Sequence, residues 1–414
     1  MRYDMNLSPF ILSLSKDCTY YPMLVKKRTA LRQAQGTEIC HESTSEPWNK
    51  ANALKLCSII GTRPEAIKMA PIAIAAAARS DMQHRLIATG QQGALFDQII
   101  AEFGLTIDAH LGHHPGSQPM DDQIAKMRAA IVQALSADRP DIVLVQGDTN
   151  SAYAAALAAH DLGIKIGHVE AGLRSGNSVR PWPEERNRIA ISRIATLHFA
   201  PSVGAEMNLR SEDVPGTIFM TGNPGIDALM LLSEPSPTRS SAIPEVMVTC
   251  HRRENFGQPL VDICSALRFI ASRNALSFVL PVHPNSEVKQ TLMHALDGVP
   301  GITLIAPLGY RQMIARVMQS RFVVSDSGGL QEECAALGIP LVLLREETER
   351  PEVVASGNCV LVGSDHDQIV LRCEQLLNEP AVHARMSRAA FPYGNGDAAC
   401  QILAAIGNSA TVHR

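Results

Sequence analysis

From Leu54 onward, short apolar runs rich in Val, Ile and Leu alternate with stretches of helical periodicity. This alternation predicts βαβ units and a parallel sheet. Because the runs are apolar throughout, the strands should be covered on both faces. The first six expected strands span residues 54–60, 85–89, 141–146, 165–169, 197–200 and 218–221, and the second six span 246–250, 277–282, 302–306, 322–325, 341–344 and 360–362.

A segment rich in Pro and Ser, residues 234–241, separates the two sets of strands and indicates a domain boundary or an exposed loop. The pattern predicts two doubly wound α/β domains of similar size, at residues 54–222 and 223–392, which face each other across a cleft. Residues 1–53 show no sustained helical or strand periodicity, so we expect them to form a disordered extension. Such a segment would also be found if translation began upstream of the true start. The apolar run at 10–12 is too short for a signal peptide.

Composition excludes several classes of protein. The 37 basic and 41 acidic residues give a net charge of −4, which argues against a nucleic-acid-binding or membrane-surface protein. No apolar run is long enough to predict a membrane span. The nine cysteines form no Cys-x-x-Cys pair, so we expect neither a disulfide scaffold nor a structural zinc site, but small buried side chains in a reducing cytoplasm.

Three acidic residues are candidates for acid–base chemistry. Asp148 and Glu170 each follow an expected strand directly, and Glu184 opens a helix within Pro-Trp-Pro-Glu-Glu. Helix capping could explain Asp148, and the helix-start preference of acids could explain Glu184. Neither explains Glu170 at a strand end. Carboxylates gathered at one sheet edge would raise the pKa of at least one of them, which provides an acid and a base near neutral pH.

The segment 61–68, Gly-Thr-Arg-Pro-Glu-Ala-Ile-Lys, forms a turn that opens a helix. It matches neither Gly-x-Gly-x-x-Gly nor the P-loop, so no dinucleotide cofactor is expected. Its backbone N–H groups, together with Arg63 and Lys68, suit an anion such as a diphosphate, although simple surface charges are the alternative.

Ser-Asp-Ser-Gly-Gly at 325–329 is a sharper signal, because it links an apolar strand to a helix. Ser327, Gly328 and Gly329 would cradle a phosphate with unhindered N–H groups, and Glu333 could accept hydrogen bonds from ribose hydroxyls. A tight turn without a ligand is the alternative reading of the two glycines.

Charged segments follow other strands of the second half. His-Arg-Arg-Glu-Asn at 251–255 follows a buried strand and should therefore lie at the cleft. A lone histidine such as His283 after the next strand is more often structural than functional. Residues 345–352 are expected to form a loop over the cleft, because they are too charged for a core.

In this order, the motifs resemble those of the bacterial non-hydrolysing UDP-N-acetylglucosamine 2-epimerases. The resemblance extends from about residue 55 to 405 and rests on Gly-Thr-Arg-Pro-Glu, Gly-Asp-Thr, His-Val-Glu-Ala-Gly-Leu-Arg, Pro-Trp-Pro-Glu-Glu, His-Arg-Arg-Glu-Asn, Asp-Ser-Gly-Gly-x-Gln-Glu-Glu and Thr-Glu-Arg-Pro-Glu. It implies a GT-B fold of two Rossmann-like domains, with the final helix, residues 393–414, returning to the first domain. It also implies a cytoplasmic homodimer that needs no metal or nicotinamide cofactor.

The resemblance also implies residue roles. Asp148, Glu170 and Glu184 would be the catalytic acids and bases, and His251 would assist the departure of UDP. The residues implied to bind UDP are Arg63, Lys68, Arg174, His283, Ser327, Gly328, Gly329 and Glu333. The implied reaction interconverts UDP-N-acetylglucosamine and UDP-N-acetylmannosamine by eliminating UDP to a glycal and adding it back.

Two departures from the family pattern leave the catalytic carboxylates intact. Gln146 stands where the family commonly has histidine before Gly-Asp-Thr, and the usual histidine after Gln91 is absent. The second segment belongs to the region where some relatives bind a regulatory substrate molecule, which argues against allosteric activation here. Three other functions stay open at this point: a GT-B glycosyltransferase, a hydrolysing epimerase, and a protein that binds nucleotide sugars without turnover.

Overall fold

The computed structural model describes residues 53–90, 93–112, 119–177, 182–233, 243–282 and 285–411. The expected extension lies outside these ranges except for Ala53, which is buried, and the Pro/Ser-rich segment 234–241 lies outside them as well. The chain divides into two compact units. Unit 1 comprises the chain up to Leu173, Asn177–Leu231 and Gly394–Arg414, and unit 2 comprises Arg174–Gly176 and Leu232–Tyr393.

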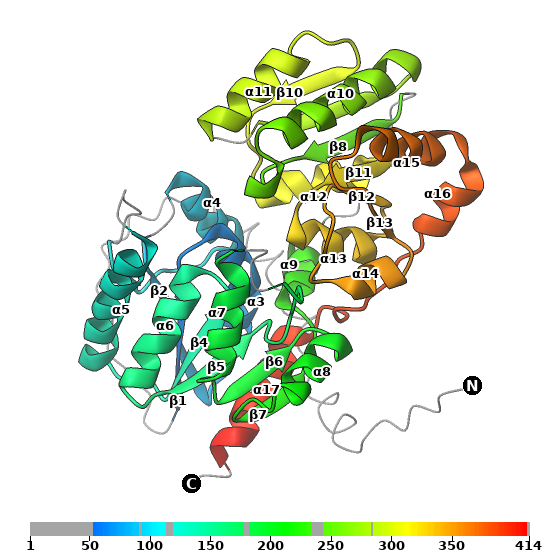
Figure 1. Ribbon diagram of the computed structural model, residues 1–414. Helices are drawn as coiled ribbons and strands as arrows, with labels where there is room; N and C mark the ends of the chain where they lie inside the picture. The colour runs from blue at the N-terminus through cyan, green and yellow to red at the C-terminus, as the bar shows by residue number, and fades with distance from the viewer. Residues whose placement is uncertain are drawn as a thin grey trace, which may run out of the picture. The chain divides into compact units, whose positions relative to one another are not determined.

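Unit 1 contains a parallel sheet of seven strands in the order β3-β2-β1-β4-β5-β6-β7. Figure 1 labels all of them except β3. Its six expected strands are confirmed to within three residues at each end, and the central ones are buried along most of their length. Strand β3 was not predicted from the sequence, because its two residues are too few to show a period. The strands are β1 (Leu54–Ile60), β2 (Met82–Ala88), β3 (Ala109–His110), β4 (Ile142–Gln146), β5 (Lys165–Val169), β6 (Leu197–Ala200) and β7 (Thr217–Met220).

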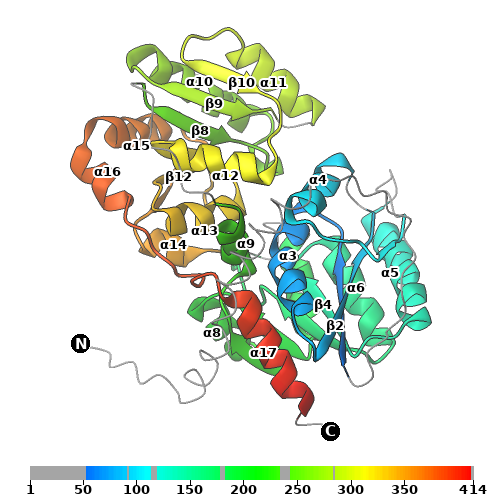
Figure 2. The same ribbon diagram turned by 180° about the vertical axis from the view of Figure 1, so that it is seen from behind.

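Helices cover both faces of this sheet. Helices α5, α6 and α7 pack side by side on one face, over a core built from alanines of α6 and aliphatic residues of the strands. Helices α3, α4 and α17 cover the opposite face, where α17 runs against α3 (Figure 2). The helices of unit 1 are α3 (Arg63–Ala77), α4 (Ala94–Phe103), α5 (Met120–Ala137), α6 (Asn150–Asp161), α7 (Glu184–Ser192), α8 (Val203–Ser211), α9 (Pro224–Leu232) and α17 (Ala398–Thr411).

One buried carboxylate fixes the last helix to unit 1. Asp227 on α9 is fully buried and accepts hydrogen bonds from the backbone N–H groups of Ala398 (3.2 Å) and Ala399 (2.9 Å) at the start of α17. The first N–H groups of a helix have no acceptor within that helix, so the Asp227 carboxylate caps the N-terminus of α17. Burial raises the pKa of Asp227 to about 7, although the hydrogen bonds from Ala399 and Ala398 act in the opposite direction.

This raised pKa predicts a pH-dependent stability. The folded chain holds the Asp227 proton more tightly than the unfolded chain, so the stability that it contributes is full at low pH and is lost as the pH rises toward about 7. Relative to Asp227→Asn, the natural chain should lose up to roughly 1.4 kcal/mol of unfolding free energy per pH unit between about pH 4 and 7. Urea unfolding of both proteins across this range measures the difference. Asp122→Asn, at an exposed position on α5, is the control, and parallel curves for Asp227→Asn and the natural chain would contradict the prediction.

Unit 2 contains a parallel sheet of six strands in the order β10-β9-β8-β11-β12-β13, and all six expected strands are confirmed. Aliphatic residues of α10, α11 and α15 form its main core against the strands. The strands are β8 (Glu245–Thr249), β9 (Ser277–Pro281), β10 (Ile302–Ile305), β11 (Phe322–Ser325), β12 (Leu341–Leu343) and β13 (Cys359–Leu361). The helices are η2 (Arg253–Asn255), α10 (Gln258–Arg273), α11 (Ser286–Leu296), α12 (Tyr310–Gln319), α13 (Gly328–Leu337), α14 (Pro351–Ala355), α15 (His366–Asn378) and α16 (Pro380–Met386).

The cysteines of the described residues are free thiols, and all but the partly buried Cys400 are buried. Burial raises the pKa of Cys57, Cys264 and Cys359 to about 12, so these thiols stay protonated and pack as small hydrophobic side chains. Among the helices in the described ranges, none combines the length and the apolar character that a bilayer crossing requires.

Candidate functional site

The strand order reverses once in each sheet, between β1 and β4 in unit 1 and between β8 and β11 in unit 2. Ligands of doubly wound sheets bind beyond the carboxyl ends of the strands at such reversals. Arg63 and Asp148 follow β1 and β4 closely, while His251 and Ser327 follow β8 and β11. The structure therefore places four of the candidate residues at the two edges where a ligand is expected.

Asp148 and Glu170 lie at neighbouring strand ends in unit 1. The strands before them pair in register, and the turn after β4 is fixed because the Gly147 N–H donates to the Val169 carbonyl at 3.0 Å. Gly147 has a φ of +70°, a conformation that most residues with a Cβ avoid. A Cβ at Gly147 would lie 3.9 Å from Glu170 Oε1, so the Glu170 carboxylate lies against the residue that precedes Asp148.

Glu170 is held in an unusual position. Its φ of +62° is rare for a residue other than glycine and costs about 1–3 kcal/mol. Its carboxylate is nearly buried, forms an ion pair with the Lys68 ammonium, and accepts a hydrogen bond from Asn223 Nδ2 at 2.7 Å. Lys68, expected to face an anionic ligand, thus neutralises a catalytic candidate. Asn223 was not predicted from the sequence, although it follows β7 and candidate residues were expected just after the strands.

Helix α7 is fixed to the loop that carries Asp148. The Arg188 guanidinium forms ion pairs with Asp148 and with buried Glu185, the latter at 2.8 Å. Asn187 Nδ2 donates to the Asp148 carbonyl at 2.9 Å. Glu184 opens the same helix one turn earlier and is half-buried. The expected cluster of like charges therefore contains compensating cations, Lys68 beside Glu170 and Arg188 beside Asp148.

The start of α3 does not offer the open anion site that the sequence suggested. The N–H groups of Gly61 and Thr62 donate to Glu65 Oε2 at 3.0 and 2.6 Å, and the hydroxyls of Thr149 and Ser151 donate to the same carboxylate. Burial raises the pKa of Glu65, while these hydrogen bonds lower it in part. The donors that a ligand would need already have an acceptor, so any binding by Arg63 would depend on its side chain.

In unit 2, the imidazole of His251 lies against a buried carboxylate. Asp326 is fully buried at the end of β11, and its Oδ1 is 3.0 Å from His251 Nδ1. The backbone N–H groups of His251 and Arg252 and the Asn255 amide also donate to this carboxylate, at 2.8 to 3.1 Å. Asp326 belongs to the Asp-Ser-Gly-Gly motif, but no role for it was predicted from the sequence. Burial alone would raise the pKa of Asp326, but the His251 side chain and the two N–H donors hold it well below the usual range.

The Ser-Gly-Gly turn forms the start of α13, as predicted from the sequence, with Ser327 as the residue before the helix. A Cβ at Gly328 would lie 3.1 Å from the Arg252 guanidinium, 3.2 Å from that of Arg350 and 3.4 Å from Glu349 Oε1, so these side chains pack closely against the helix start. A Cβ at Gly329 would meet nothing within 4 Å. The side chain of Ser327 does not cap the helix, and the helix start lies beside two cations, an arrangement that suits a phosphate group.

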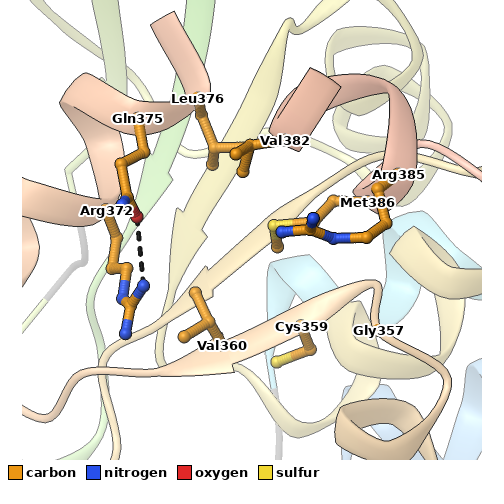
Figure 3. A pocket seen from close by; sticks show the side chains of 9 residues that line it. All are labelled: Gly357, Cys359, Val360, Arg372, Gln375, Leu376, Val382, Arg385 and Met386. Carbon is orange, nitrogen blue, oxygen red and sulfur yellow. Dashed lines mark hydrogen bonds between the residues drawn. The ribbon is translucent and has the colours of Figure 1, made fainter. Parts of the chain in front are cut away.

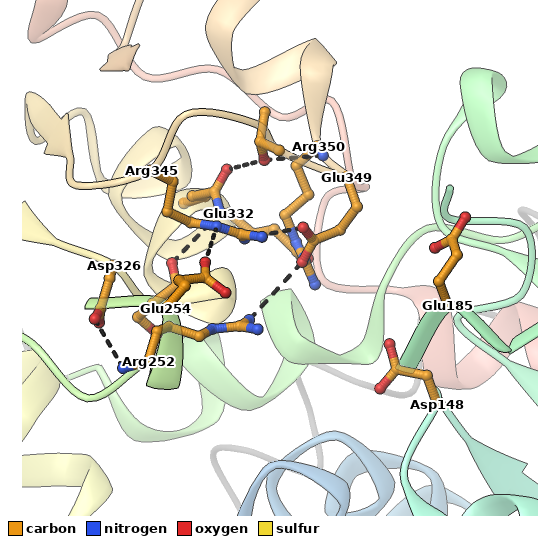
Figure 4. Close-up of polar contacts among 12 residues, drawn as sticks. Asp148, Glu185, Arg252, Glu254, Asp326, Glu332, Arg345, Glu349 and Arg350 are labelled. Atoms are coloured by element: carbon orange, nitrogen blue, oxygen red, sulfur yellow. Dashed lines mark hydrogen bonds and ion pairs between the residues drawn. The ribbon is translucent and has the colours of Figure 1, made fainter. Parts of the chain in front are cut away.

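The charged segment after β12 is more buried than the sequence suggested. Arg345, Glu349 and Arg350 are each 5% exposed or less, because their charges pair with one another and with buried Glu332 (Figure 4). The expected loop is present at 345–350, and Glu346 and Glu347 are exposed. The expectation that the segment is too charged for a core was wrong for the three buried residues, because charges of both signs neutralise each other inside unit 2. Arg252 extends the network, with its guanidinium 3.9 Å from Glu349.

The remaining predicted binding residues differ in how they are held. Glu333 lies on the first turns of α13, and its Oε1 accepts a hydrogen bond of 2.6 Å from the buried Tyr310 hydroxyl. Arg174 lies in the coil after β5 and is half-buried. His283 lies outside the described residues.

A hollow of about 290 Å³ in unit 2 contains none of the predicted residues. It lies between β13, α15 and α16, with Arg372 and Arg385 at its sides and aliphatic groups such as Val360 and Leu376 on its walls (Figure 3). It is remote from the strand ends that carry the candidate residues, so it is not the candidate site.

Comparison with known proteins identifies the family. Residues 74–407 match the family model described as UDP-N-acetylglucosamine 2-epimerase. The chain is 39% identical over 368 residues to the UDP-N-acetylglucosamine 2-epimerase of Campylobacter jejuni, covering 84% of this chain and 96% of that protein. The Neisseria meningitidis UDP-GlcNAc 2-epimerase bound to UDP-GlcNAc superposes with a TM-score of 0.82 at 34% identity, covering 86% of this chain and all of the other.

A further solved structure agrees with these relatives. The Methanocaldococcus jannaschii UDP-GlcNAc 2-epimerase in complex with UDP-GlcNAc and UDP has a TM-score of 0.76 and 31% identity, covering 86% of this chain and all of the other. The two doubly wound units are those of the GT-B fold, as expected from the sequence. The chain belongs to the UDP-N-acetylglucosamine 2-epimerase family.

Proposed function

We propose that this protein is an isomerase that interconverts UDP-N-acetylglucosamine and UDP-N-acetylmannosamine without releasing the free sugar. The observation that carries the proposal is the pair of acids Asp148 and Glu170, fixed at neighbouring strand ends by Arg188 and Lys68. The family match and the UDP-GlcNAc bound to the Neisseria relative support the choice of substrate.

The proposed reaction inverts C2 of the sugar through elimination. A base removes the C2 proton while the bond from C1 to the UDP oxygen breaks, and the leaving oxygen takes the electron pair. UDP then adds back to the resulting glycal, and an acid returns a proton to the other face of C2. Inversion therefore needs proton-transferring groups on two sides, for which Asp148, Glu170 and Glu184 are the candidates. Each such group contributes about 10²- to 10⁴-fold.

Retention of UDP between the two steps is the second requirement. We assign it to the start of α13, where Ser327, Gly328 and Gly329 offer backbone donors beside the guanidinium groups of Arg252 and Arg350. Glu333, positioned by Tyr310, would accept hydrogen bonds from the ribose. Binding by Arg63, Lys68, Arg174 and His283 remains a prediction, as do the homodimer and the cytoplasmic location.

The proposal predicts exchange of one hydrogen. In heavy water, with neither metal nor nicotinamide added, both UDP sugars should interconvert and take up deuterium at C2, because the proton is removed and returned by side chains that exchange with solvent. Proton NMR follows the loss of the C2 signal and the growth of the second isomer. A strict requirement for NAD or zinc would overturn the proposal.

The same experiment separates the alternatives. A hydrolysing epimerase would accumulate free N-acetylmannosamine and UDP, and a glycosyltransferase would leave UDP-N-acetylglucosamine unchanged without an acceptor. A protein that binds nucleotide sugars without turnover would bind UDP saturably, and the C2 proton would not exchange.

A further inference from the structure

We propose that Asp326 is the positioning residue for His251: its buried carboxylate fixes the imidazole with the proton on Nδ1, so that Nε2 is the atom that exchanges a proton with the departing UDP. The inference rests on the proposed function for the identity of the leaving group. The geometry of the Asp326–His251 pair is independent of the substrate.

The two oxygens of Asp326 have different surroundings. Oδ2 accepts from the His251 N–H (2.9 Å), the Arg252 N–H (2.8 Å) and Asn255 Nδ2 (3.0 Å), so it anchors the turn after β8. Oδ1 faces the imidazole, 3.0 Å from Nδ1, and also lies 3.1 Å from the His251 N–H. The Cys250 thiol is a further hydrogen-bonding neighbour of this carboxylate. One oxygen therefore holds the backbone and the other orients the ring.

The charge state of Asp326 decides which way the ring hydrogen bond runs. Although the group is fully buried, the His251 side chain and the N–H groups directed at it keep its pKa well below the usual range. An ionised carboxylate has no proton to donate, so Nδ1 must carry the hydrogen that joins the two groups. The side chain of His251 is 40% exposed, whereas Asp326 is not exposed at all, so the ring extends from the buried carboxylate toward the surface. Fixing one tautomer through the second ring nitrogen is a common way to prepare the other for proton transfer.

With Nδ1 protonated, His251 can both give and recover a proton at Nε2 during the elimination and the re-addition of UDP. As an imidazolium, His251 gives its Nε2 proton to the UDP phosphate oxygen that takes the electron pair from C1. It remains as the neutral ring with its proton on Nδ1, the form that Asp326 holds. When UDP adds back, Nε2 recovers the proton. The ring need not turn between the two steps.

Asp326→Asn tests the inference with little change in shape. The three donors around the Oδ2 position favour the amide oxygen there, which places the NH₂ group opposite His251 Nδ1. Nδ1 would then have to accept, and the ring proton would move to Nε2. We expect kcat to fall by about 10²-fold or more, with KM for the UDP sugar changed by less than about 3-fold, since the loop stays anchored. Heteronuclear NMR should show neutral His251 protonated on Nδ1 in the natural protein and on Nε2 in the variant, with His251→Gln identifying the signal.

A double variant distinguishes positioning from general damage. If Asp326 acts through His251, then Asp326→Asn should cost less than about 3-fold in kcat when introduced into His251→Gln. Asp227→Asn, a matched change of a buried carboxylate that accepts two N–H groups, should leave kcat and the His251 signal unchanged. The inference would be overturned if the kcat losses of the two single variants added up in the double variant, or if neutral His251 carried its proton on Nε2 in the natural protein. Absence of epimerisation by the natural protein would instead refute the proposed function, and the tautomer could still be measured.

Discussion

Replacing Asp148 by Asn, or Glu170 by Gln, is expected to lower kcat by about 10²-fold or more, because each change keeps the shape of the side chain and removes the oxygen that carries the proton. The hydrogen bonds that hold these positions can persist, since an amide oxygen can still accept from Arg188 or Lys68. UDP affinity should change by less than about 3-fold, because the proposed phosphate cradle belongs to unit 2.

Steady-state epimerisation and calorimetric titration with UDP measure the two quantities separately. Asp122→Asn serves as the control, since it makes the same chemical change at an exposed position of unit 1 and should leave both values unaltered. If the two variants lost UDP binding and still turned over bound substrate at the natural rate, the roles assigned to the two units would be wrong.

The fold could be predicted well from the sequence because buried parallel strands carry their signal locally. Strand β11, Phe-Val-Val-Ser, is apolar up to its last residue, and β5 keeps buried residues between Ile166 and Val169 although it contains Lys165 and His168. Both strands were predicted to the residue. Strand β3 has only two residues, at the edge of its sheet, and no local pattern distinguishes it from a loop. The hydrogen bonds from the start of α17 to Asp227 join residues about 170 positions apart, and no periodicity of the sequence predicts such a contact.

The candidate site could be predicted only in part, because local sequence patterns show which residues follow strands but not which distant residues they contact. Residues that follow strands meet at one edge of the sheet, so Asp148, Glu170 and Ser327 could be selected by position. Their partners could not: Lys68 and Glu170 are 102 residues apart. Such pairs exist only in the folded chain. The buried charges around Arg350 were misjudged because composition alone cannot show that charges of opposite sign neutralise each other.

Arg350→Met is expected to destabilise unit 2 by about 3–5 kcal/mol, the range for a buried ion pair that loses one partner. The Arg350 guanidinium donates to Glu332 and to Glu349, each at 2.5 Å, and all three side chains are nearly buried. Without the cation, Glu332 loses its ion pair with Arg350, while Glu349 keeps its ion pair with Arg345 at 2.9 Å. Calorimetry, with hydrogen exchange of residues 328–350 to localise the loss, measures the effect.

A double variant separates the stability role of Arg350 from its role at the phosphate cradle. Arg350→Met combined with Glu332→Leu removes both charges of the pair, so we expect it to recover at least about half of the lost unfolding free energy. UDP affinity should stay low in both variants, because the Arg350 guanidinium lies beside the start of α13 and a leucine cannot replace its charge. Arg210→Met, which breaks an exposed pair with Glu206 on α8, should cost less than about 0.5 kcal/mol. If the double variant regained both stability and UDP affinity, Arg350 would support the fold of the cradle without taking part in binding the diphosphate.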